Sequence, residues 1–328
     1  MGRPGWQVGW FPDCVARRVG VLFRGWSVLR TAGVLSEVRT DTRARSVSAK
    51  KLMLDLRCEG CVAEPYLHST EKAANSEVPR SLYLSLLKRS LTNTLFEAEP
   101  DPDEDEFRFV RERANHYVKG AALSMLPLVR LDNIESCIVD VLENGVPGDL
   151  IETGVWRGGA TIFMRAVLKA YGVTDRAVWA ADSFEGLPTP DAEKFPLEAK
   201  VQLGPVMQKA YNNLMVSLEE VNRNFQAYAL LDDQVHFLKG WFKDTLPTAP
   251  IRTLALLRLD GDFYESTRDS LVSLYDRVSV GGYVIVDDYG EESWTYCRRA
   301  VDEFREERGI VEPLLKVDSK CTYWKRVR

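Results

Sequence analysis

The sequence predicts an α/β protein built on a mostly parallel sheet that ends in an antiparallel hairpin. From Asp149 onward, short apolar runs of strand type alternate with segments of helix type. Two consecutive runs end in aspartates, at Asp260 and at Asp287–Asp288, and the last two runs are separated only by the turn Asp318–Lys320. Parallel strands need long crossovers, whereas a short polar turn joins antiparallel strands, so both arrangements are expected in one sheet.

Composition limits the classes of function. The chain has 328 residues, of which 45% are hydrophobic, so it can bury a full core. A net charge of −5 argues against non-specific nucleic-acid binding, and no uninterrupted apolar run reaches the ~18 residues of a membrane span. The six cysteines are too scattered for a disulfide framework and fit a reducing cytoplasm. We therefore expect a soluble, cytoplasmic protein.

Residues 1–77 are expected to form a poorly ordered basic extension. They contain many arginines between Arg17 and Arg45 and no clear periodic apolar pattern. A targeting peptide, a partner-binding segment, a dispensable tail and an over-long assigned start all fit this composition. Cys58 and Cys61 have the spacing of half a zinc knuckle, but no second pair follows them.

Residues 78–148 are expected to form a helical cap. A first helix should start at Pro79, and the acidic link Glu97–Glu106 should be solvated. A second helix is predicted from Asp132 to Glu143, because Asn144–Gly148 is a strong stop signal.

Residues 149–328 are expected to form the core domain. Strands are predicted at Asp149–Val155, Ala177–Ser183, Val235–Trp241, Thr253–Asp260, Tyr283–Asp288, Ile310–Val317 and Cys321–Val327. Helices are predicted at Ala160–Ala170, Thr267–Val278 and Trp294–Arg308. A Rossmann-like α/β sheet that ends in an antiparallel hairpin is characteristic of class I methyltransferases.

An insertion at about Pro190–Asp233 interrupts this alternation and should contain an extended amphipathic helix. It lies between the second and third strands, so its position over the strand tips makes it a candidate lid.

The aspartates at the strand ends predict a metal site. Neighbouring strands lie about 4.8 Å apart, so Asp260, Asp287 and Asp288 should meet at one edge of the sheet. Three carboxylates suit Mg²⁺, Mn²⁺ or Ca²⁺ better than zinc. Such an edge is the usual place for ligands in open α/β sheets.

The turn after the first strand favours a nucleoside ligand. Gly154, Gly158 and Gly159 let the backbone approach a ligand closely, but they lack the three-glycine spacing of nicotinamide-binding proteins. Glu152 could bind the α-amino group of a methionine-like ligand, and Asp182, at the end of the second strand, could accept hydrogen bonds from both hydroxyls of a ribose. Each signal alone has a structural explanation: tight packing for the turn and helix capping for Asp182.

Five segments together resemble the macrocin O-methyltransferase family. They are Leu150–Gly159 (LIETGVWRGG), Ala181–Pro188 (ADSFEGLP), Phe237–Phe242 (FLKGWF), Leu259–Thr267 (LDGDFYEST) and Gly282–Tyr289 (GYVIVDDY). The match runs from about Val78 to the C-terminus. The resemblance implies an S-adenosylmethionine- and Mg²⁺-dependent enzyme that methylates a sugar hydroxyl on a natural product such as a macrolide.

The resemblance also implies roles for individual residues. Residues expected to bind the cofactor are Met125, Glu152, Gly154, Asp182, Ser183, Gly240 and Trp241, of which Met125 and Trp241 could equally be core residues. Asp260, Asp287 and Asp288 are the expected metal ligands. Asp260 is the expected general base, Asp262 is the alternative, and His116 and His236 are more distant candidates. Coordination to Mg²⁺ would lower the pKa of the acceptor hydroxyl.

Two other functions are compatible with the sequence. One is an O-methyltransferase that acts on a catechol, a polyketide hydroxyl or a free sugar. The other is a non-catalytic, cofactor-binding homologue. The expected partners are a small-molecule glycosylated acceptor and a second copy of the chain, and neither nucleic acid nor a membrane is expected.

Overall fold

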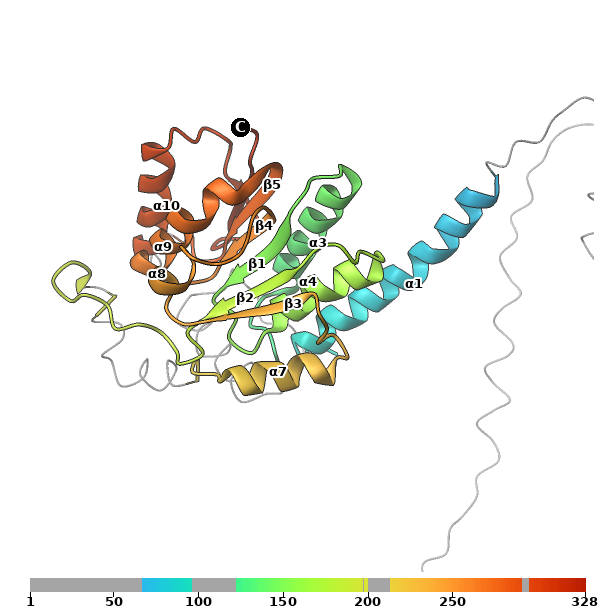
Figure 1. Cartoon of the computed structure of the whole chain (residues 1–328), viewed down its shortest axis with the longest axis horizontal. Helices are drawn as coiled ribbons and strands as arrows, with labels where there is room; N and C mark the ends of the chain where they lie inside the picture. Colours follow the sequence, from blue (N-terminus) through green and yellow to red (C-terminus); the bar gives the residue numbers. More distant parts are fainter. Residues whose placement is uncertain (1–66, 96–121, 197, 200–212, 291–294) are drawn as a thin grey trace, which may run out of the picture. The chain divides into compact units, whose positions relative to one another are not determined.

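The computed structural model describes residues 67–95, 122–196, 198–199, 213–290 and 295–328 (Figure 1). Several sequence predictions lie outside these residues. They are the basic extension up to residue 66, the Cys58–Cys61 pair, the acidic link Glu97–Glu106 and His116.

The core is a seven-stranded sheet with the strand order β3-β2-β1-β4-β5-β7-β6. Strands β1 to β5 pair with one another in parallel, and β7 is antiparallel to both β5 and β6. The strands are β1 (Asp149–Thr153), β2 (Val178–Asp182), β3 (Val235–Lys239), β4 (Leu254–Leu259), β5 (Val278–Val286), β6 (Leu315–Lys316) and β7 (Thr322–Lys325). This sheet confirms the predicted fold class.

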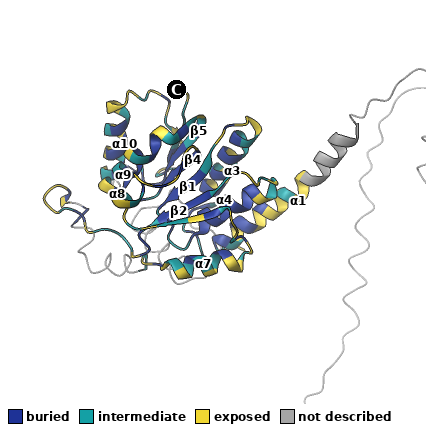
Figure 2. Ribbon diagram, in the orientation of Figure 1, coloured by how far each residue is buried: buried dark blue, intermediate teal, exposed yellow. Residues whose placement is uncertain are grey.

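Helices cover both faces of the sheet (Figure 1). On one face, α1 (Leu67–Leu91), α3 (Leu128–Glu143), α4 (Gly159–Ala170) and α7 (Leu218–Ala227) contribute to one apolar core. On the other face, α8 (Phe242–Thr245), α9 (Tyr264–Leu274), the short η2 helix (Tyr275–Arg277) and α10 (Thr295–Glu307) surround a second core. The central strands are therefore buried on both faces, which explains why they are continuous apolar runs (Figure 2).

Some predicted boundaries were wrong. Helix α1 does not start at Pro79 but passes through it, because the leucines that follow pack into the core and hold the helix despite the missing N–H group of proline. Helix α3 begins at Leu128, directly after Pro127. The last two strands are shorter than predicted; Pro313, which cannot donate a ladder hydrogen bond, lies in the segment before β6.

Strand β5 begins at Val278, earlier than the predicted start at Tyr283, and includes Gly281 and Gly282. The pairing between β4 and β5 shifts register between Leu254 and Leu256, and this irregularity accommodates the glycines. The preceding helix accordingly ends at Leu274 and continues only as η2.

The insertion between β2 and β3 contains a core element. Helix α7 buries Val221 and Phe225, and the ring of Phe225 meets that of Phe237 on β3 edge to face at a centroid distance of 5.7 Å. A helical crossover is what joins two parallel neighbouring strands, so α7 belongs to the scaffold. The candidate lid is thereby restricted to the part of the insertion before Leu218.

Among the residues that the structure describes, no helix is both long and apolar enough to span a bilayer.

Candidate active site

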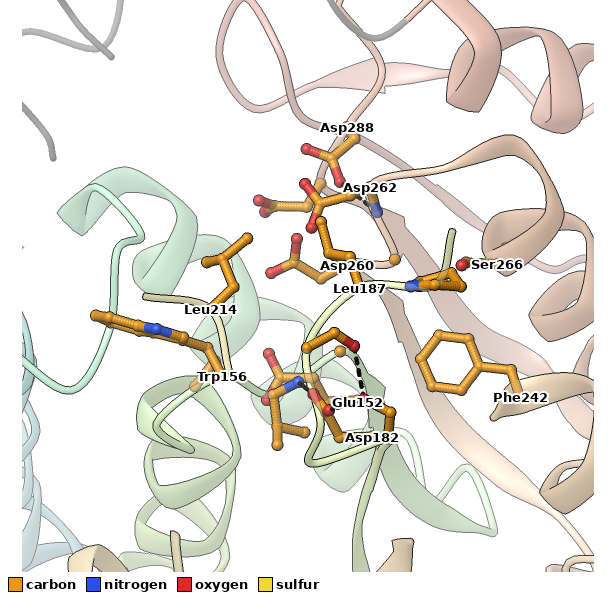
Figure 3. A pocket seen from close by; sticks show the side chains of 18 of the residues that line it. Glu152, Trp156, Asp182, Leu187, Leu214, Phe242, Asp260, Asp262, Ser266 and Asp288 are labelled. Atoms are coloured by element: carbon orange, nitrogen blue, oxygen red, sulfur yellow. Dashed lines mark hydrogen bonds between the residues drawn. The ribbon is translucent and has the colours of Figure 1, made fainter. Parts of the chain in front are cut away.

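A cavity of about 670 Å³ opens at the carboxyl ends of β1 to β5. Figure 3 shows Asp260, Asp262 and Asp288 on one side of it, and Glu152 and Asp182 on another. Every cofactor or metal residue that the sequence predicted lines this cavity: Met125, Glu152, Gly154, Asp182, Ser183, Gly240, Trp241, Asp260, Asp287 and Asp288. Residues far apart in the chain are thus brought to one place.

The glycine turn after β1 fixes the distance between two strand tips. Gly154 has a φ of +90°, and a Cβ atom there would lie 1.8 Å from the backbone oxygen of Asp260. A Cβ atom on Gly159 would lie 2.4 Å from the oxygen of Leu123, whose carbonyl accepts the Gly159 N–H at 3.0 Å. The segment that contains Leu123 and Met125 therefore lies against the start of α4, beside the cavity.

Asp182 is held by backbone groups. Its Oδ2 atom accepts the N–H of Val155 at 2.8 Å, and its Oδ1 atom accepts the N–H of Phe184 at 2.7 Å. Burial raises the pKa of Asp182, and these N–H groups act in the opposite direction. The Ser183 hydroxyl makes a longer contact with Oδ1, at 3.4 Å, so the carboxylate is fixed at the edge of the cavity by neighbouring turns.

Glu152 is buried at the tip of β1, with an exposed fraction of 2%. Its Oε1 atom lies 2.5 Å from a guanidinium nitrogen of Arg258, and its Oε2 atom accepts a hydrogen bond from the Thr161 hydroxyl. Burial raises the pKa of Glu152 to about 7, while Arg258 and Thr161 act against this rise. The carboxylate is thus fixed in orientation before any ligand binds.

Asp260, Asp287 and Asp288 form the cluster expected to bind a metal. One carboxylate oxygen of each lies within 4.8 Å of one oxygen of each of the others. Burial, with the negative charges of Asp262, Asp260 and Asp287, raises the pKa of Asp288 well above its ordinary value. A cation would offset this repulsion, and three hard oxygen ligands suit Mg²⁺, Mn²⁺ or Ca²⁺. The residues present therefore fit a hard divalent cation.

Two buried arginines contact the acids, and sequence analysis missed both. Arg258, on β4, pairs with Glu152, with Asp260 at 2.9 Å and with Asp287 at 2.5 Å. Arg130, on α3, lies 2.6 Å from Asp287 and 2.6 Å from Asp318.

Arg258 could have been found, because a charged residue inside the apolar run LALLRL needs a buried partner. Arg130 carries no such signal, since its partner Asp287 is 157 positions away in the sequence.

The candidate bases separate clearly. Asp260 and Asp262 both line the cavity, and the backbone N–H of Asp262 donates to Asp288 at 3.3 Å. His236 is exposed on β3 beside the ring of Trp179, at a centroid distance of 4.5 Å, and does not line the cavity. The choice between the two aspartates stays a prediction.

Aromatic residues form part of the cavity wall. Trp241 is 36% exposed at the start of α8 and is therefore not a core residue. Trp156, which sequence analysis did not assign, has a φ of +48° and donates its indole N–H to the Asn213 carbonyl at 2.9 Å. Figure 3 shows Trp156 beside Leu214. The glycine turn after β1 is thus tied to the insertion.

Comparison with known proteins gives consistent results. Residues 110–326 match the family model described as macrocin-O-methyltransferase (TylF). The chain is 48% identical over 264 residues to demethyldecarbamoylnovobiocin O-methyltransferase of Streptomyces niveus, covering 79% of this chain and 98% of that protein. It is 46% identical over 250 residues to mycinamicin III 3''-O-methyltransferase of Micromonospora griseorubida, covering 75% and 96%.

One solved structure of an O-methyltransferase is similar to this chain in both sequence and fold. The structure of the O-methyltransferase NovP is 49% identical in sequence and covers 76% of this chain and 100% of its own, with a TM-score of 0.66.

Proposed function

The chain belongs to the macrocin O-methyltransferase family, and on this premise we propose that it moves the methyl group of S-adenosylmethionine to a hydroxyl of a deoxysugar on a glycosylated natural product, with Mg²⁺ as the metal. One observation carries the proposal. A single cavity is lined both by the acids suited to a nucleoside and amino-acid ligand, Asp182 and Glu152, and by the three-aspartate cluster.

The cofactor half of the site would act by positioning. Asp182 would accept hydrogen bonds from the ribose hydroxyls, and Glu152 would face the amino group of the methionine part. Gly154 and Ser183 would contribute backbone and hydroxyl contacts, while Trp241 and the Gly240 backbone would border the adenine. Because S-adenosylmethionine already carries an activated methyl group, alignment and exclusion of water are the main tasks that remain for the protein.

The metal half would activate the acceptor. A divalent cation held by Asp260, Asp287 and Asp288 supplies positive charge that lowers the pKa of a nearby hydroxyl. Asp260, which lines the cavity and belongs to the cluster, would accept the proton. Asp262, on the same loop, is the alternative base.

The acceptor would enter beside the insertion. Leu187, Pro188 and Leu214 give this wall an apolar surface that suits the ring of a deoxysugar. The relatives named above are a novobiocin-type and a mycinamicin methyltransferase, and these names support a glycosylated acceptor for this chain as well.

Calorimetry of the parent chain and of a variant with both Asp287→Ala and Asp288→Ala would test the proposal. We expect the parent to bind both S-adenosylmethionine and Mg²⁺, and the variant to bind the cofactor while losing at least about 100-fold in metal affinity, since two of three ligands are gone. The matched activity assay is methyl transfer to glycosylated macrolides, detected by mass spectrometry.

The other outcomes distinguish the alternatives. Cofactor binding without metal binding in the parent would favour a non-catalytic homologue. Binding of both ligands with transfer only to non-sugar hydroxyls would overturn the sugar assignment. Absence of cofactor binding would overturn the roles given to Glu152 and Asp182.

We also propose that the protein is a homodimer in the cytoplasm. Helix α1 exposes four large apolar side chains, Val78, Leu82, Tyr83 and Leu86, on the surface away from the core. A second copy would cover them. Light scattering should give a dimer mass for the parent and a monomer mass for a variant with both Leu82→Lys and Leu86→Lys.

The cytoplasmic location is supported by the cysteines. Cys137, Cys297 and Cys321 are free and buried, in keeping with a reducing compartment.

A further inference from the structure

A row of charged side chains, three of which line the cavity, forms its floor. Glu152, Arg258, Asp287, Arg130 and Asp318 alternate in sign, and each contacts the next at 2.5 or 2.6 Å. Both arginine side chains of this row are at most 3% exposed. The row crosses from the tip of β1, through β4 and β5, to the turn between β6 and β7.

The sheet register places Arg258 at the centre of this row. Glu152 and Arg258 are partners in the β1–β4 pairing, and Arg258 and Ile285 are partners in the β4–β5 pairing. Side chains alternate along a strand, so residues two positions apart point to the same face. Asp260 lies two positions after Arg258, and Asp287 lies two positions after Ile285, so both point to the face of Arg258. This is the face covered by α3 and α4, which carry Arg130 and Thr161.

The guanidinium of Arg258 divides its donors between the two halves of the site. Its Nη1 atom donates to Glu152 at 2.5 Å and to Asp260 at 2.9 Å, and its Nη2 atom donates to Asp287 at 2.5 Å. Glu152 has the role of cofactor ligand, whereas Asp260 and Asp287 are in the metal cluster. One rigid planar group thus sets the spacing among three carboxylates with two different tasks.

We propose that Arg258 is a positioning residue that holds the cofactor-binding and metal-binding carboxylates in one fixed arrangement, so that both ligands depend on it. The inference rests on the proposed function for the identity of the two ligands. Two other side chains donate hydrogen bonds to these acids, and each donates to one half. Thr161 holds Glu152 and no member of the cluster, and Arg130 holds Asp287 but neither Glu152 nor Asp260.

The test compares Arg258→Lys with two matched variants, Thr161→Val and Arg130→Lys. Lysine keeps the positive charge of Arg258, so the charge of the cluster is unchanged, but one ammonium group cannot bridge three carboxylates as the planar guanidinium does. Calorimetry of the full chain would measure the affinity for S-adenosylhomocysteine and, separately, for Mn²⁺. Melting temperatures would show that each variant is folded.

Each variant has a distinct expected result. Arg258→Lys should lower the affinity for S-adenosylhomocysteine and the affinity for Mn²⁺, each by about 10- to 100-fold, because charge-assisted hydrogen bonds are lost. Thr161→Val should lower only the affinity for S-adenosylhomocysteine, and Arg130→Lys should lower only the affinity for Mn²⁺. A second variant, Arg258→Gln, retains amide donors and should repeat the double loss.

The opposite results are equally clear. If the parent binds both probes and Arg258→Lys lowers neither affinity or only one of them, the bridging role is wrong although the proposed function stands. If both Arg258 variants fail to fold, the residue is purely structural and the inference is overturned. If the parent itself binds neither probe, the proposed function fails and the inference falls with it.

Discussion

Asp182 and Asp287, one in each half of the cavity, are held by different means. At the tips of β1 and β2, Asp182 is fixed by backbone N–H groups of Val155 and Phe184. At the tips of β4 and β5, Asp287 is fixed by the side chains of Arg258 and Arg130. Val155 lies 27 positions from Asp182 in the sequence, whereas Arg130 lies 157 positions from Asp287. The surroundings of Asp182 therefore depend on local turns, and those of Asp287 depend on how α3 packs against the sheet.

The largest expected effect comes from forcing the two halves apart. Gly154→Ala would place a methyl group 1.8 Å from the backbone oxygen of Asp260, at a φ of +90° that alanine rarely adopts. We expect the free energy of unfolding to fall by about 3 kcal/mol, together with losses in affinity for both cofactor and metal. Urea unfolding and calorimetry would measure these changes.

A surface glycine provides the control for this substitution. Gly172 also has a positive φ, of +70°, but a Cβ atom there meets nothing within 4 Å. Gly172→Ala should therefore lose only about 1 kcal/mol, from backbone strain, and leave both affinities unchanged. Equal effects of the two substitutions would mean that contact between the halves is unimportant.

An intermediate effect should be confined to the cofactor half. Asp182→Asn replaces one carboxylate oxygen by an NH₂ group, which cannot accept both backbone N–H groups and ribose hydroxyls. Affinity for S-adenosylhomocysteine should fall by about 10- to 100-fold. The affinity for Mn²⁺ should stay within about twofold of the parent, because Asp182 has no contact with the three-aspartate cluster. A comparable loss of metal affinity would contradict the separation of the halves.

The smallest effect concerns the contact between the insertion and helix α9, which follows Asp260 and Asp262. Glu198 accepts the N–H of Tyr264, the first residue of α9, at 2.8 Å, and no side chain of the residue before α9 caps that helix. Burial and then the charge of Glu265 raise the pKa of Glu198 from 4.5 to about 7, while the Tyr264 N–H lowers it.

The pH dependence of stability follows from the raised pKa of Glu198. The stabilising contribution of the protonated acid is fully present below about pH 4.5 and is lost as the pH rises to about 7. Glu198→Gln cannot ionise, so its melting temperature should exceed that of the parent by about 2 °C at about pH 8 and by little at about pH 4.5. Glu193→Gln, at an exposed position in the same segment, should show no such trend. A pH-independent difference for Glu198→Gln would refute the assignment.

The sequence predicted the sheet and the positions of its acids because both depend on local patterns. Asp182, Asp260 and Asp287 follow apolar runs, and parallel strands bring their tips to one edge. Helix boundaries at Pro79 and strand β5 were missed because packing and a register shift overrode local signals. The pairing of Arg130 with Asp287 could not be predicted, since it depends on how α3 docks on the sheet.

The contrast between floor and wall bears on how such an enzyme can change its acceptor during evolution. The floor consists of buried ion pairs and of a backbone contact at Gly154 that leaves no room for a side chain, so substitutions there should disturb folding or ligand binding. The wall beside the insertion is made of apolar residues such as Leu187 and Leu214, which belong to neither the ion pairs nor the sheet. Substitutions in the wall should reshape the cavity without disturbing these ion pairs, and we expect them to change which acceptor fits while cofactor binding is kept.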